Sequence, residues 1–112
     1  MSTEEELQEL EDNMNDAKQF IDIKDSTLKL FKNREFKKVV LEYYFKEEAA
    51  RLVMAKASNL NDEQQKLIDN MIYGIGALSN FFDSVLTRGL QAEQAYKDDE
   101  NARTEILQED LS

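Results

Sequence analysis

The sequence predicts an all-α protein. Proline is absent from the 112 residues and only three residues are glycine, so little in the chain interrupts a helix or forms the tight turns of a strand-rich fold. Apolar residues make up 41% of the chain and recur at steps of three and four, the period of an amphipathic helix. We therefore expect a single helical domain over residues 1–112: an antiparallel helical hairpin with an additional N-terminal helix, forming either a three-helix bundle or an oligomeric coiled-coil assembly.

The first predicted element is an acidic N-terminal helix over residues 1–25. Ser2 and Glu5 have the spacing of a capping box, which predicts a helix start at the beginning of the chain. Lys24 stands where another apolar residue would belong, and residues 25–27 could cap a new turn, so both one long helix and two helices stay open. A narrow seam of the coiled-coil type follows the remaining apolar residues: Leu7, Leu10, Met14, Ala17, Ile21, Leu28 and Phe31.

The helical hairpin is predicted over residues 33–96. Asn33 is the expected N-cap of a helix over residues 34–57, and the polar turn 58–62 leads into the last helix, which should run antiparallel to it. The main apolar face of the first of these helices comprises Phe36, Val39, Val40, Tyr43, Tyr44, Ala50 and Leu52, widened by Leu41, Phe45 and Val53. That of the last helix comprises Leu67, Met71, Ile72, Ile75, Leu78, Phe82, Val85 and Leu86, with Phe81 beside it.

Two features of the last helix remain. Gly74 and Gly76 lie inside the helical pattern, where each costs about 1 kcal/mol relative to alanine. We attribute them to close packing, by Tyr43, Tyr44, Phe45 or another helix. Residues 97–112 are strongly charged and form either an acidic tail or an extension of the helix.

Charge is unevenly distributed along the chain. The net charge is −10, but residues 1–25 carry −7, residues 26–58 carry +4 and residues 59–112 carry −7. In one interpretation the acidic arms fold back and neutralise the basic middle. In the other, the basic residues form a patch for phosphate or for an acidic protein surface. The candidate patch is Lys29, Lys32, Arg34, Lys37 and Lys38.

The residue types for most active sites are missing. Histidine and cysteine are both absent, which removes the commonest general base, the commonest metal ligand and any thiolate chemistry. We therefore predict no enzyme and assign no catalytic, cofactor-binding or metal-binding residues. The polar, acidic N-terminus does not resemble a secretory signal, and no stretch is apolar enough for a membrane span, so we expect a soluble protein of a reducing compartment.

Two segments together carry a resemblance to a known group. Residues 36–52, an aromatic-rich helix ending in Glu-Ala-Ala-Arg-Leu, are followed by Ile-Gly-Ala-Leu at residues 75–78 and then by Phe81 or Phe82. This pair resembles small helical proteins of tailed bacteriophages whose genes accompany virion-structure modules. The resemblance covers roughly residues 26–100, brings no catalytic residues with it, and implies a component of the virion or of its assembly, located in the virion or the host cytoplasm.

Three functions follow as expectations. The first is a non-catalytic virion structural or assembly accessory protein that contacts copies of itself or other virion proteins through its helices. The alternatives are a small acidic inhibitor of a host nucleic-acid enzyme and a cytoplasmic helical adaptor with a partner coiled coil on its N-terminal seam. No direct binding to nucleic acid or membrane is expected. The candidate interaction residues are Leu7, Leu10, Met14, Tyr43, Tyr44, Phe45, Phe81 and Phe82.

Overall fold

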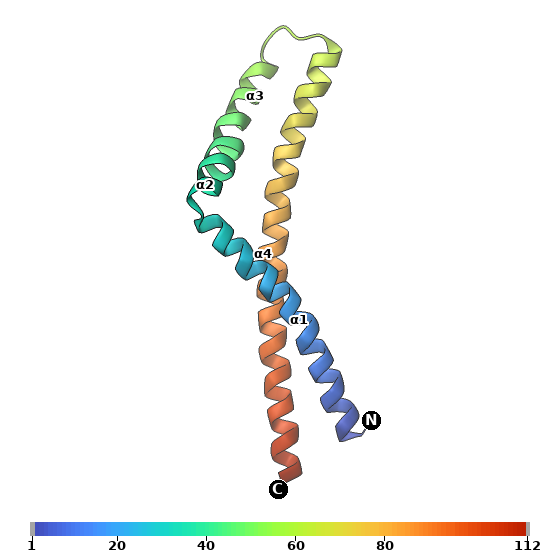
Figure 1. Ribbon diagram of the computed structural model, residues 1–112. Helices are drawn as coiled ribbons and strands as arrows, with labels where there is room; N and C mark the ends of the chain where they lie inside the picture. The colour runs from blue at the N-terminus through green and yellow to red at the C-terminus, as the bar shows by residue number, and fades with distance from the viewer. Residues whose placement is uncertain (1, 112) are drawn as a thin grey trace. The chain divides into compact units, whose positions relative to one another are not determined.

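The described chain, residues 2–111 of a computed structural model, is almost entirely helical (Figure 1). It contains no strand in the described residues, which confirms the predicted all-α class. The elements are α1 (Thr3–Lys32), α2 (Arg34–Phe36), the π-helix η1 (Lys37–Glu48), α3 (Ala49–Lys56) and α4 (Asp62–Leu111).

The helix ends lie where side chains can cap them. The Ser2 hydroxyl accepts a hydrogen bond from the backbone N–H of Glu5 at 3.2 Å. Asn33 interrupts the first helix and starts the next, because its side chain accepts the N–H of Phe36 at 2.9 Å. Asn61 and Gln64 cap each other's backbone N–H groups at the start of α4. These reciprocal bonds stabilise the otherwise unpaired donors of a helix start.

Two alternatives left open by the sequence are resolved by element length. α1 is one continuous helix through residues 24–27, so the side chains of residues 25–27 do not start a second helix. α4 runs for 50 residues to Leu111, so the charged stretch 97–111 is an extension of the helix.

The middle of the chain departs from the expected α-helix. Residues 37–48 form a 12-residue π-helix, in which hydrogen bonds join residues five apart instead of four. Between Phe36 and Leu52 the less exposed residues recur every four positions, in the pairs 40 and 41, 44 and 45, and 48 and 49. This wider turn gives the segment a different contact face from the one that an α-helical period predicts.

The chain divides into two compact units. The terminal unit comprises the described residues of Met1–Thr27 and Val85–Ser112, and the central unit comprises Leu28–Ser84. In the terminal unit the early part of α1 lies beside the late part of α4, and in the central unit η1 and α3 lie beside the early part of α4 (Figure 1).

Candidate interaction surfaces

The terminal unit is packed through small side chains. Met14, Ala17, Val85 and Ala92 are its buried apolar residues, each less than 9% exposed. Leu7 and Leu10 are half-buried on the same side of α1, and Leu10 lines a shallow groove with Ala102 and Ile106. Over the first half of α1, the predicted apolar seam therefore packs against α4 of the same chain.

Lys24, the predicted gap in that seam, is buried with only 7% of its surface exposed. Its ammonium forms an ion pair with Glu93 and a second one, at 3.3 Å, with Asp25. Its aliphatic stem crosses Gly89: a Cβ added there would lie 2.6 Å from Cγ and 2.7 Å from Cδ of Lys24. The lysine fits between the helices because residue 89 has no side chain. Apart from a charged residue in an apolar seam, no sequence signal indicates this pairing.

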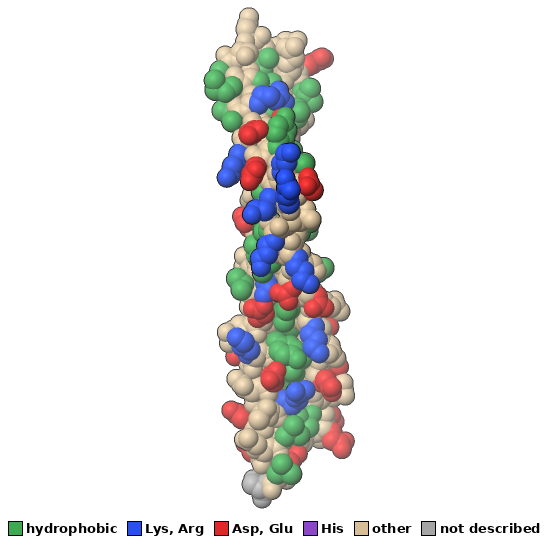
Figure 2. All heavy atoms as spheres, turned by 60° about the vertical axis from the view of Figure 1, so that its left-hand side comes forward, with side chains coloured by type: hydrophobic (Ala, Val, Ile, Leu, Met, Phe, Trp, Pro, Cys, Tyr) green, Lys and Arg blue, Asp and Glu red, His purple; other side chains and the backbone are tan. Residues whose placement is uncertain are grey.

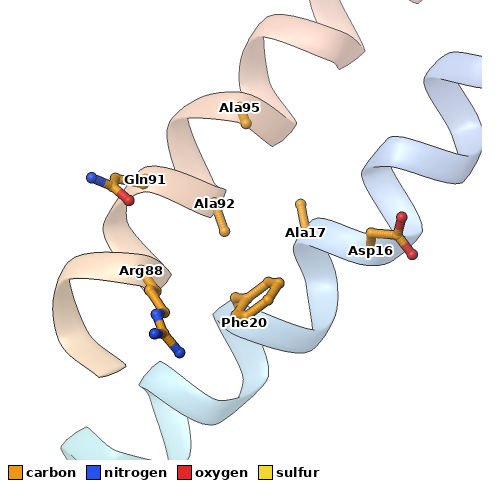
Figure 3. Close-up of a pocket in the computed structure, with 7 residues that line it drawn as sticks. All are labelled: Asp16, Ala17, Phe20, Arg88, Gln91, Ala92 and Ala95. Carbon is orange, nitrogen blue, oxygen red and sulfur yellow. The ribbon is translucent and has the colours of Figure 1, made fainter. Parts of the chain in front are cut away.

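A groove of about 430 Å³ opens between the helices of the terminal unit (Figure 3). Its floor is formed by Ala17, Ala92 and Ala95, and Phe20 reaches across it from α1 with 47% of its surface exposed. Asp16, Arg88 and Gln91 complete the lining. The groove is apolar with a polar rim, an arrangement that suits a protein side chain better than a charged ligand.

In the central unit an aromatic cluster replaces the small-residue seam. Phe82 is at its centre, with ring centroids of Phe31 at 5.2 Å, Phe36 at 5.8 Å and Phe45 at 6.3 Å. All three contacts are edge-to-face, the geometry that aromatic quadrupoles favour. Phe31 and Phe36 stack on each other at 6.0 Å across the break at Asn33. The cluster therefore connects the end of α1, the start of the next helix and α4.

The candidate aromatic residues are divided between inside and outside. Tyr44, Phe45 and Phe82 are half-buried, whereas Tyr43 is 53% and Phe81 57% exposed. The predicted inner faces are wrong at five further positions, and in the segment before the turn the reason is that the wider turn of η1 moves the contact face. The expected inner residues that are exposed are Val39, Ala50, Val53, Leu67 and Met71.

The glycine prediction is wrong for Gly76 and weak for Gly74. A Cβ at Gly76 would meet nothing within 4 Å, and one at Gly74 would meet the Tyr44 hydroxyl at an ordinary 3.7 Å. The glycine that close packing requires is Gly89. In the sequence, Gly89 is marked only by a lower density of apolar residues after it. Only the partner helix distinguishes the three positions, so sequence spacing could not identify Gly89.

Four of the five predicted basic-patch residues line one hollow. Lys32, Arg34, Lys37 and Lys38 surround a depression of about 490 Å³ together with Glu42. All four are exposed, and no ion pair in the described part of the chain involves them. Lys29 does not line the hollow. The space-filling view shows Lys and Arg side chains gathered over this part of the surface (Figure 2).

One exposed ion pair strengthens the end of η1. The Arg51 guanidinium donates to both carboxylate oxygens of Glu48, with Nε to Oε2 at 3.1 Å. These hydrogen bonds lower the pKa of Glu48, because they favour the charged carboxylate. Such a pair one helical turn apart supports local helix structure and indicates no chemistry.

Among residues 2–111 no group of three or more acidic, histidine or cysteine side chains is placed to hold a metal ion. No described helix is long and apolar enough to cross a membrane. No protein-family model matches the sequence, and neither a curated protein nor a solved structure matches the chain.

Proposed function

We propose that the protein is a non-catalytic virion structural or assembly accessory protein, which acts through helix-mediated contacts with copies of itself or with other virion proteins. The observation that carries this proposal is the large amount of apolar surface that the central unit leaves uncovered. The virion role comes from the resemblance of residues 36–52 and 75–82 to small helical phage proteins.

Two paired helical segments cannot enclose all the large apolar side chains that this region contains. Leu52 and Ile75 are the only buried apolar residues described in the central unit. Ten large hydrophobic residues of the same unit are exposed, and Tyr73 at 79% and Met54 at 74% are the most exposed. They are Leu28, Leu30, Val39, Tyr43, Val53, Met54, Leu67, Met71, Tyr73 and Phe81. A monomer rarely leaves so many large apolar groups in water, so a protein surface is expected to cover them.

The part of this surface on η1 supplies the sharpest test. Val39 and Tyr43 are one turn apart, both more than half exposed, and line a shared hollow of about 350 Å³. Val39→Ser with Tyr43→Ser should lower the solution mass measured by light scattering and native mass spectrometry. Leu111→Ser is the matched control, because Leu111 is 89% exposed at the end of α4. A wild-type chain that stays monomeric at high concentration, with no partner, would contradict the proposal.

The virion role needs its own measurement. Mass spectrometry of purified virions and of assembly intermediates should detect the chain in one of them at a fixed copy number. A chain that is expressed but absent from both would exclude the virion role while leaving self-association untouched.

A second candidate, the acidic inhibitor of a host nucleic-acid enzyme, is favoured by one observation. Residues 3–16 of α1 carry seven acidic side chains and no basic one, and six of the seven are exposed. A pull-down from host lysate at low and at moderate salt should recover such an enzyme if this function is correct. Recovery of only the chain's own copies supports the first proposal instead.

A further inference from the structure

The hollow lined by Lys32, Arg34, Lys37 and Lys38, here called the basic cluster, carries charge that the chain leaves without a partner. Four cations surround one depression, and Glu42 is the only acid that lines it. Lys24, Arg51 and Lys56, by contrast, each form an ion pair with an acid. Other exposed bases of the chain also lack an ion pair, but the basic cluster differs from them because four such cations line one hollow with a single acid.

The position of the basic cluster along the helices also has a cost. Lys32 lies in the last turn of α1, where a cation interacts favourably with the helix dipole. Arg34, Lys37 and Lys38 lie in the first turns of the helical stretch that begins after Asn33, where the dipole disfavours positive charge. Folding of this stretch would be better served by acids at the three positions. Their charge is therefore better explained by an anionic partner than by the fold.

The chain itself contains a matching anionic surface. Glu5, Glu9, Asp12 and Asp16 occupy one face of α1, at steps of four, three and four residues, and all are exposed. No base interrupts the helix before Lys18. These four residues, here called the acidic stripe, are spaced over about 17 Å of helix.

α1 is continuous from Thr3 to Lys32, so the helix contains no loop between the acidic stripe and Lys32 at which the chain could reverse its direction. We therefore take a second copy as the source of the acidic stripe that meets the basic cluster.

We propose that the acidic stripe of one copy binds the basic cluster of a second copy. This inference rests on the proposed self-association and specifies one of its contacts. The two surfaces are different, so the contact is heterologous, and each copy offers one of each surface to its neighbours. Repetition of such a contact produces a closed ring or an open filament, both of which are ways to build an assembly from one small chain.

Charge reversal in the full-length chain tests the contact. One variant carries Glu5→Lys, Glu9→Lys and Asp12→Lys, and the other carries Arg34→Glu, Lys37→Glu and Lys38→Glu. Each variant alone should associate at least about tenfold more weakly than the wild type, because several ion pairs become repulsive together. An equimolar mixture should recover the association, since each surface then meets a complementary one. Analytical ultracentrifugation measures all three samples, and circular dichroism confirms that each variant is helical.

The matched control reverses three exposed lysines outside the basic cluster: Lys46→Glu, Lys66→Glu and Lys97→Glu. It changes the net charge by the same amount as the Arg34, Lys37 and Lys38 variant, so it measures general repulsion between copies. The association constant of the wild type should also fall between about 0.1 M and about 1 M salt, as the Debye length decreases from about 10 Å to about 3 Å.

The outcomes separate this inference from the proposed function. Recovery in the mixture, with the control still associated, supports the contact. Variants that associate as the wild type does, or a mixture that does not recover, overturn it. If those variants associate normally while Val39→Ser with Tyr43→Ser dissociates, self-association is correct and the acidic stripe has another role. A wild-type chain that remains monomeric contradicts both.

Discussion

The terminal and central units pair helices by opposite means. In the terminal unit the buried residues include Ala17, Ala92 and Gly89, and a buried lysine that is paired with Glu93 crosses Gly89. In the central unit they are separated by aromatic rings centred on Phe82. Close approach covers the interface with small groups, whereas aromatic packing leaves wide, partly exposed faces. The comparison indicates that the central unit is the better suited to accept a partner.

The largest expected effect is the loss of the ring at the centre of the aromatic cluster. Phe82→Ala should lower the free energy of unfolding by about 3 kcal/mol, the lower end for a phenylalanine truncation, because Phe82 is only half-buried. Urea unfolding followed by circular dichroism measures it. The neighbouring Phe81→Ala is the control and should cost less than about 1 kcal/mol, since Phe81 is 57% exposed. Equal losses would show that Phe82 has no central role.

The next effect tests close approach in the terminal unit. Gly89→Ala should destabilise the chain by up to about 2 kcal/mol, because overpacking costs about 1–3 kcal/mol while the better helix propensity of alanine returns about 1 kcal/mol. The added methyl would collide with the stem of Lys24. Lys24→Gly should partly relieve the cost in a double mutant, and the coupling energy from the double-mutant cycle measures it. A stabilising Gly89→Ala would show that the helices are not in close contact there.

A smaller effect concerns the charge between the helices. Glu93→Gln should lower the free energy of unfolding by about 1 kcal/mol, because buried Lys24 then keeps only the exposed Asp25 as its ionised partner. Lys24→Met should be closer to neutral, since an apolar group at this position replaces an ion pair that has lost hydration. Thermal unfolding of the two variants should rank them in this order, and the reverse order would show that Lys24 contributes more as a cation than as a filler of space.

The smallest expected effect has the opposite sign. Gly76→Ala should raise the free energy of unfolding by up to about 1 kcal/mol, because its Cβ meets no neighbour and alanine restricts the unfolded chain. Chemical unfolding beside Gly89→Ala gives the comparison directly. A loss of stability would mean that residue 76 is covered in an assembly, which the unfolding midpoint at several protein concentrations would reveal.

Local signals predicted well what depends on neighbours in sequence. The helix starts at Ser2, Asn33 and Asn61 follow from cap residues three positions before a donor, and the first part of the seam follows from apolar spacing. The π-helix cannot be predicted in this way, because Val39, Val40 and Leu41 provide apolar side chains for the inner face of an α-helix as well as for that of a π-helix. The roles of Gly89 and Phe82 cannot be predicted from neighbours in sequence either, since each depends on which residues from a distant part of the chain lie opposite. The sequence predicts the basic residues of this region, but only the structure shows that four of them line one hollow.

The π-helix changes how residues 36–52 must be placed on a helical wheel. Sixteen residues separate Phe36 from Leu52, and an ideal α-helix would rotate them to about 160° apart, nearly opposite sides. In the structure Phe36 contacts Phe82 and Leu52 is 2% exposed, so both are directed inward. The wider turns of the π-helix rotate each residue by a smaller angle than an α-helix does, which keeps both side chains on the inner side. Alignments or designs that impose one constant phase across residues 36–52 will therefore place the second half of the segment on the wrong side.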